Sequence, residues 1–165
     1  MKLAHATVLL SQGVPFLEGG VEIGRTKGGR DNSYNAGDAV NRFDWSRARE
    51  FAEIHAYFQG LIALRRAHPA LRCATRAEVE RTLRFLPPIS PNVLAFTLDG
   101  RVSGDSWREI LVILHNGLRP AELPLPSGSW NVVADEKTAG VRPLRIIKGK
   151  LPLAPLSATV LCRNG

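Results

Sequence analysis

Turn signals divide the second half of the chain into short apolar segments, and this pattern constrains the fold more than any other feature. The turns are expected at Pro87-Pro88, Asp99-Gly100, Asn116-Gly117, Ser127-Gly128 and Gly149. Seven candidate strands lie around them: Thr82–Leu86, Val93–Leu98, Ile110–His115, Glu122–Leu125, Trp130–Ala134, Leu144–Ile147 and Ala158–Cys162. Short strands at such regular spacing are typical of an antiparallel β-sandwich. We therefore predict a mostly β fold.

The first half of the chain has the pattern of helices and loops. Leu3–Leu10 fits the end of a helix that closes with a left-handed cap at Gly13. The apolar run Val14–Leu17, followed by Gly19-Gly20, suits a buried parallel strand. Helix, turn and strand would form half of an α/β unit. The change of pattern near residue 75 predicts two units, 1–75 and 76–165.

A second helix is predicted from apolar residues that recur every three or four positions. They are Phe51, Ile54, Phe58, Leu61 and Ile62. Asp44 or Ser46 can cap its start, and Pro69 ends it at His68. Trp45 and Trp130 are expected in the core, whereas Trp107 suits either a core or a sugar-stacking role.

Composition limits the partners of this chain. The net charge of +7 comes mostly from arginine, but no aromatic residues interleave with the arginines of segment 65–84, as base stacking requires. We expect no nucleic acid. No apolar window is long enough to span a membrane, and Leu3–Leu10 does not resemble a signal peptide, so the location stays open and the cytoplasm is favoured. Cys73 and Cys162 fit either one bridge or two thiols.

The segment 24–44 is a long polar loop, and long loops of this kind often carry function. Its amide, hydroxyl and guanidinium groups are those that hydrogen-bond sugar hydroxyls. Carboxylates at Glu18, Glu22, Asp31, Asp38 and Asp44 suit catalysis or structural pairing; we favour pairing and assign no catalytic residue. The histidines lack metal-ligand spacing, and no phosphate-binding fingerprint is present. We therefore expect neither a metal nor a cofactor.

One ordered set of motifs resembles the type I pullulanases, the α-1,6-glucan debranching members of the α-amylase superfamily. The motifs are Gly13-Val14-Pro15-Phe16, Gly20-x-Glu22, Arg25-Thr26-Lys27, Asn32-Ser33-Tyr34-Asn35, Asp38, Asn41, Asp44-Trp45 and the helix Gly60–Ala70. The resemblance implies that residues 1–75 are the end of a (β/α)8 barrel: a helix-strand-loop-helix remnant. Residues 76–165 would be the β-sandwich C-terminal domain.

The same resemblance places substrate contacts on the loop, at Arg25, Asn32, Tyr34, Asn35 and Asp38, with an α-glucan as ligand. A loop that only bonds to itself is the alternative. The family usually has His-Ala-Gly-Gln-Glu where this chain has Glu18-Gly19-Gly20-Val21-Glu22, which puts sugar contacts there in doubt.

The nucleophilic Asp, the acid/base Glu and the second Asp of the family have no counterpart in this sequence. The chain alone is expected to be catalytically incomplete. A non-catalytic carbohydrate-binding or protein-interaction module is the alternative. We further expect the helix Phe51–Leu64 to pack on the β-domain or on a neighbouring copy of the chain. The first 20 residues should be poorly anchored, rearranged or paired between chains, and the exposed surfaces of the barrel remnant should self-associate.

Overall fold

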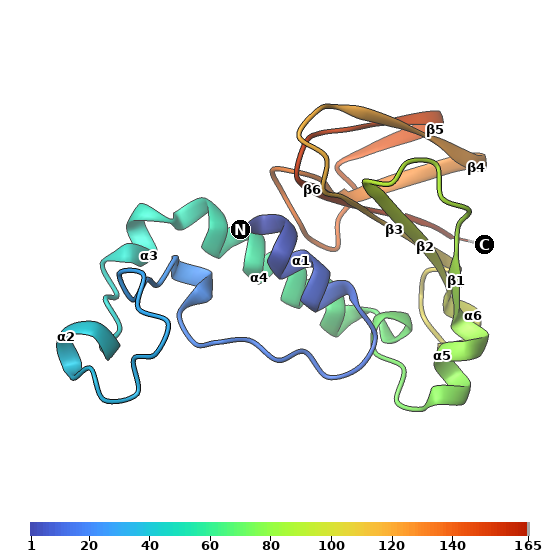
Figure 1. Cartoon of the computed structure of the whole chain (residues 1–165). Helices are drawn as coiled ribbons and strands as arrows, with labels where there is room; N and C mark the ends of the chain where they lie inside the picture. The colour runs from blue at the N-terminus through green and yellow to red at the C-terminus, as the bar shows by residue number, and fades with distance from the viewer. Residues whose placement is uncertain (165) are drawn as a thin grey trace.

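Six antiparallel strands form one continuous sheet in the computed structural model, which describes residues 1–164 (Figure 1). The strands are β1 (Leu83–Phe85), β2 (Val93–Asp99), β3 (Glu109–His115), β4 (Ala121–Ala134), β5 (Arg145–Leu153) and β6 (Ser157–Arg163). Their order in the sheet is β1-β2-β3-β6-β4-β5. The mostly β fold class is confirmed.

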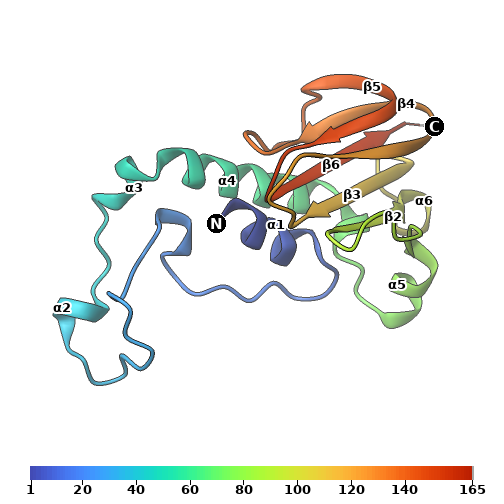
Figure 2. The same ribbon diagram turned by 45° about the horizontal axis from the view of Figure 1, so that its top comes forward.

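The sheet curls so that one of its faces closes on its own core. Leu111, Leu123, Trp130, Val132 and Leu151, from strands β3, β4 and β5, pack in a single buried cluster. The expected sandwich is therefore built from one folded-over sheet (Figure 2). Trp130 is fully buried, which confirms its expected place in the core.

Strand β4 replaces two of the predicted strands. It runs from Ala121 to Ala134 and pairs with β5, with an irregularity of register between Pro124 and Ser129. Gly128 has a φ of +106° there, a conformation that glycine adopts without strain. The Ser127-Gly128 signal thus marks a bulge within one strand, where the sequence pattern predicted a turn between two.

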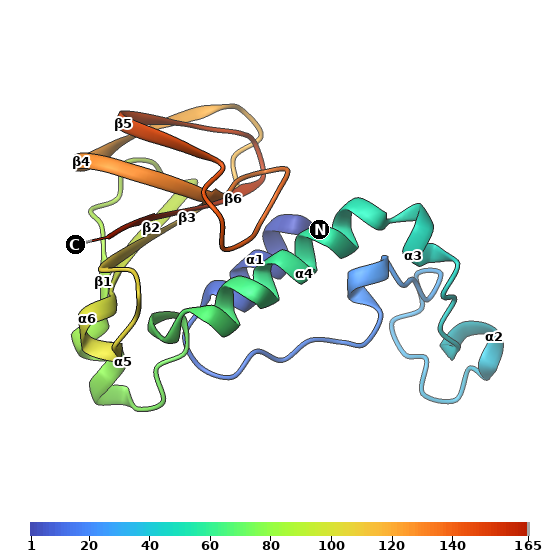
Figure 3. The ribbon, with the colours of Figure 1, turned by 180° about the vertical axis from the view of Figure 1, so that it is seen from behind.

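Two helices cover the other face of the sheet: α1 (Lys2–Leu10) and α4 (Ala52–Ala67), which lie side by side (Figures 1 and 3). Leu9 of α1 and Leu61 of α4 are buried in one cluster with Phe96, Val112 and Val160 of the sheet. Both predicted helices are present, but their predicted caps are wrong. Helix α4 begins at Ala52 without a side-chain cap from Asp44 or Ser46, and α1 ends at Leu10, before Gly13. The expectation that the first 20 residues are poorly anchored is wrong for α1, because its apolar side is buried against the sheet and α4.

A buried arginine fastens the end of α1 to α4. The Arg65 guanidinium donates hydrogen bonds to the carbonyl oxygens of Leu9 at 2.8 Å, Ser11 at 2.7 Å and Leu71 at 2.9 Å, and also to that of Gly13. Three of these carbonyls lie at or beyond the last turn of α1, which has unpaired acceptors. Arg65 therefore satisfies the end of one helix from the surface of another.

The predicted strand Val14–Leu17 is wrong. These residues are extended but belong to no sheet, and in the described part of the chain their backbone makes no backbone hydrogen bond. Val14 and Phe16 are 95% and 93% exposed. A parallel strand needs neighbours on which to form its ladder, and residues 1–164 supply none beside this segment.

The remaining helices are short: η1 (Val21–Ile23), α2 (Asp38–Asn41), α3 (Arg47–Glu50), η2 (Pro69–Leu71), α5 (Arg76–Thr82) and α6 (Gly100–Ser103). Helix α5, which we did not predict, begins with a reciprocal capping box between Thr75 and Glu78. Within residues 1–164, no helix combines the length and apolar content needed to span a membrane. Cys73 and Cys162 are free thiols, which settles the open alternative.

Candidate functional site

The loop 24–44 projects beyond α1 and α4, away from the sheet (Figures 1 and 2). Arg25 holds its two ends together: the guanidinium donates to the carbonyl of Gly19 at 3.2 Å and to that of Asn41. It also lies 4.3 Å from the centroid of the Phe43 ring. The Asn41 side chain donates in turn to the Ser33 carbonyl at 2.7 Å. Arg25 is thus the internal brace of the loop.

The other four predicted contact residues lie on the exposed surface of the same loop. Asn32, Tyr34, Asn35 and Asp38 are all exposed, Tyr34 to 95%. The Asn32 side-chain oxygen accepts a hydrogen bond from the Tyr34 amide at 3.2 Å, which fixes a local turn. Arg25 lines a cavity of about 180 Å³ with Asp44 and Arg47. The structure therefore separates a bracing arginine from four side chains that are accessible to a ligand.

The carboxylates near the loop are engaged in local contacts. Glu18 lies 3.0 Å from Lys27 and 3.5 Å from Arg25, and Glu22 accepts from the Gly20 amide at 3.0 Å. The hydrogen bond from Lys27 lowers the pKa of Glu18, and hydrogen bonds from Ser46 lower the pKa of Asp44. These are structural pairings, and the lowered pKa values are the opposite of what a general acid requires.

An exposed aromatic pair flanks the loop, and the sequence pattern missed it. Phe43 and Trp45 stack with ring centroids 5.4 Å apart and an interplanar angle of 14°. Trp45 is 67% exposed, so its expected place in the core is wrong. The helix that should have buried it begins only at Ala52, after the short helix α3. The polar residues next to Trp45 in the sequence, Asp44 and Ser46, could have indicated that this side chain is exposed.

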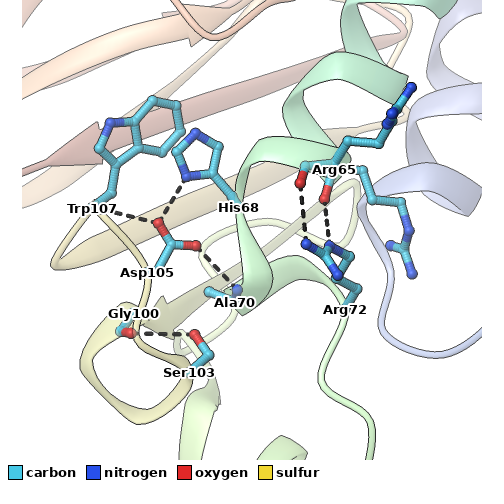
Figure 4. A network of polar contacts seen from close by, with 9 residues as sticks. Arg65, His68, Ala70, Arg72, Gly100, Ser103, Asp105 and Trp107 are labelled. Atoms are coloured by element: carbon cyan, nitrogen blue, oxygen red, sulfur yellow. Dashed lines mark hydrogen bonds and ion pairs between the residues drawn. The ribbon is translucent and has the colours of Figure 1, made fainter.

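A buried polar network joins the end of α4 to the β-domain (Figure 4). His68 Nδ1 lies 2.8 Å from the carboxylate of Asp105, which also accepts from the amides of Ala70 at 3.1 Å and Trp107 at 2.9 Å. The His68 ring stacks on that of Trp107 at 3.4 Å. Burial alone would raise the pKa of Asp105, but the hydrogen bonds from His68, Trp107 and Ala70 lower it overall. Trp107 thus has a packing role.

No group of three or more metal-ligating side chains occurs among the residues that the structure describes. His5 packs edge-on against Phe58 with ring centroids 5.1 Å apart, and His115 Nδ1 lies 2.8 Å from the Ala154 carbonyl. These contacts, like that of His68, are structural. The exposed side chains of the loop carry hydroxyl, amide, aromatic and charged groups.

Comparisons with known proteins agree on one family. The model of the pullulanase all-beta domain matches residues 79–138. The pullulanase of Bacillus subtilis (strain 168) is 40% identical over 126 residues, which are 76% of this chain and 17% of that protein. An isoamylase from Flavobacterium sp is 36% identical over 157 residues, covering 81% of this chain and 20% of that protein.

Solved structures show the same relationship in three dimensions. The pullulanase from Bacillus acidopullulyticus superposes with a TM-score of 0.93 at 42% identity, over 98% of this chain and 20% of that one. The type I pullulanase from Bacillus subtilis str. 168, complexed with maltose, superposes with a TM-score of 0.91 at 34% identity, over 99% of this chain and 23% of that one.

These similarities assign the chain to a class of protein: it matches a segment of a glycoside hydrolase that includes the all-β domain. Within that class the chain is similar to the pullulanases and corresponds to a segment of their C-terminal portion. It spans about a fifth of the length of the relatives that it matches.

Proposed function

We propose that this chain forms the C-terminal part of a debranching glycoside hydrolase that acts on the α-1,6 linkages of pullulan, starch or glycogen. The observation that carries the proposal is the superposition of nearly the whole chain on pullulanases at about 40% identity. Residues 1–75 would be the end of the catalytic barrel, and residues 76–165 the C-terminal β-domain.

In this proposal the chain binds substrate and does not break the glycosidic bond. Retaining hydrolysis needs two carboxyl groups about 5–5.5 Å apart, one of them with a raised pKa. The carboxyl groups of residues 1–164 whose pKa values depart from the ordinary range all depart downward. None of these groups is therefore suited to protonate a leaving group at neutral pH.

The proposed ligand is an α-glucan held by the exposed face of the loop 24–44. Pullulanases that superpose on this chain have been crystallised with maltotetraose and maltotriose. We assign Asn32, Tyr34, Asn35 and Asp38 to contacts with sugar hydroxyls or rings, because these side chains are exposed. Arg25 supports them by holding the ends of the loop, and the Trp45 ring offers an apolar face for a sugar.

Maltotetraose binding and an activity assay test this proposal. We expect the purified chain to bind maltotetraose in calorimetry and to release no reducing sugar from pullulan. Tyr34→Ala should weaken binding at least tenfold, because an exposed aromatic ring loses its contact without disturbing the core. Phe85→Ala removes a ring that is 62% exposed on β1 and should leave binding within twofold. Hydrolysis of pullulan, or equal effects of the two substitutions, would contradict the proposal.

A second candidate is an interaction module that self-associates. The observation that favours it is the extended segment 14–18, whose Val14 and Phe16 side chains are almost fully exposed. Unpaired extended backbone is a template for pairing with another chain. In this alternative the loop 24–44 needs no sugar, and the exposed apolar side chains are covered by a second copy.

A further inference from the structure

Five arginines line one groove, and residues of α5, α6 and the adjoining strands contribute to its lining. Figure 1 shows α5 and α6 close together at one end of the sheet. The arginines are Arg81, Arg84, Arg101, Arg108 and Arg163, and the groove has a volume of about 340 Å³. The groove belongs to the β-domain and is lined by none of the loop residues assigned to sugar binding. Its function is therefore separate from the one proposed above.

Strand register builds the floor of this groove. Asp99 of β2 lies opposite Glu109 of β3, and Glu109 lies opposite Arg163 of β6. Two residues before Asp99 in β2, Thr97 lies opposite Arg84 of β1. Arg81 comes from the last turn of α5 and Arg108 from the residue before β3. Residues that are far apart in the sequence thus meet at one end of the sheet.

The two carboxylates of the groove each have their own arginine. Arg101 binds Asp99 through two hydrogen bonds, at 2.9 and 2.7 Å, and Arg163 donates to Glu109 at 2.7 Å. Among the described residues, Arg84 donates to the backbone carbonyls of Glu80 and Leu83 alone. Within residues 1–164, Arg81 and Arg108 form no ion pair.

Positive charge is therefore in excess at this place. Five arginines and two acidic residues line the groove, so its lining carries a net charge of three positive units. Like charges held together repel each other unless an anion accompanies them. A guanidinium group binds phosphate oxygens through pairs of N–H donors. It has five such donors, so an arginine that is paired with one carboxylate keeps donors for a phosphate.

We propose that this groove binds the phosphate group of a small molecule, with Arg81 and Arg108 as its principal ligands and Arg84 and the Thr97 hydroxyl beside them. The volume accommodates pyrophosphate or a monosaccharide phosphate. A phosphate carries close to two negative charges at neutral pH and so offsets most of the excess. Arg101 and Arg163 keep their carboxylates and shape the walls.

Calorimetric titration of the full chain at low ionic strength tests the site with three probes: pyrophosphate, inorganic phosphate and glucose 6-phosphate. We expect saturable binding of one equivalent that weakens as salt is added. The double substitution Arg81→Gln with Arg108→Gln should weaken binding at least tenfold. The matched control is Arg66→Gln with Arg119→Gln, two exposed arginines outside the groove, which should change binding less than twofold.

The comparison of glucose 6-phosphate with inorganic phosphate identifies the source of the phosphate group. Tighter binding of glucose 6-phosphate than of inorganic phosphate assigns the site to a phosphorylated sugar, and equal binding assigns it to the free anion. Absence of binding by all three probes, or equal weakening by the two pairs of substitutions, would overturn the proposal. If the variant with both Arg81 and Arg108 replaced fails to fold, the site is tested on the unaltered chain by following its amide NMR chemical shifts as phosphate is added. Shifts confined to residues that line the groove, Arg81, Thr97 and Arg108 among them, support the site, and dispersed shifts refute it.

Discussion

Asp105 shows how one residue can join two parts of the chain. Its carboxylate is fully buried and receives hydrogen bonds from the His68 ring and the Ala70 amide, at the end of α4, and from the Trp107 amide in its own loop. A buried carboxylate persists only when such donors compensate for lost hydration. The pair His68–Asp105 therefore links the helical layer to the β-domain by a polar contact inside an otherwise apolar interface.

Replacing Asp105 by Asn should lower the free energy of unfolding at pH 7 by about 1–3 kcal/mol, because at least one buried donor loses a charged acceptor. The pKa of Asp105 in the folded chain lies below its ordinary value of 3.8. Its contribution is therefore complete above that pH and is lost as the pH falls towards the folded pKa. Urea unfolding at pH 7 and near pH 3 should show the deficit of the variant shrinking in acid.

The control for this measurement is Asp31→Asn, which alters an exposed carboxylate that accepts a hydrogen bond from the neighbouring Asn32 amide. It should change the free energy of unfolding by less than about 0.5 kcal/mol. A deficit in Asp105→Asn that is the same at both pH values would argue against an ionised Asp105 as the stabilising species.

At the scale of elements, the packing of α4 on the β-domain depends on a glycine. A methyl group built on Gly60 would lie 1.9 Å from the carbonyl oxygen of Ala139, in the segment between β4 and β5. Helix and backbone therefore touch directly at this point. Glycine is a poor helix former, and its presence in the middle of α4 is explained by this close approach.

Gly60→Ala should destabilise the chain by about 1–3 kcal/mol, because α4 or the 139 segment must move to relieve the clash. Propensity alone predicts the opposite, a gain of about 1 kcal/mol from alanine. Thermal and urea unfolding decide between the two signs. Gln59→Ala, at the exposed neighbouring position, isolates the effect of propensity and should be neutral or slightly stabilising. A stabilised Gly60→Ala chain would show that the contact is not close in solution.

At the scale of the whole molecule, Val14 and Phe16 are the two most exposed apolar side chains on the segment 14–18 that follows α1. They are two residues apart, and their side chains are almost fully exposed. If self-association is their function, sedimentation velocity should show a concentration-dependent dimer of the unaltered chain. Val14→Ser with Phe16→Ser should weaken dimerisation at least tenfold.

Leu118→Ser with Ile146→Ser provides the matched control, since these side chains are 80% and 69% exposed but belong to the β-domain. This pair should leave the dimer unchanged. A chain that stays monomeric at every concentration, or a dimer that both pairs weaken equally, would remove the second candidate function.

The local sequence pattern predicted the helices whose apolar residues recur along one face. It failed where the structure depends on contacts between residues that are far apart in the sequence. The helix around Leu61 follows from periodicity, and the helix around Leu9 is predicted from its end signal at Gly13. Val14–Leu17 has the composition of a buried strand, but burial requires partners that periodicity does not report. The arginine groove was equally invisible, since only the pairing of β2, β3 and β6 brings Asp99, Glu109 and Arg163 together. The division at residue 75 stays a prediction.

The place of β6 in the sheet has a consequence for how the polypeptide acquires its shape during translation. β6 is the last strand in sequence, yet it lies between β3 and β4 and is buried on both faces. The hairpins β2–β3 and β4–β5 can form as they leave the ribosome, but they have no shared ladder until Ser157–Arg163 emerges. The nascent β-domain therefore remains in two unjoined halves until almost the whole of it has been synthesised.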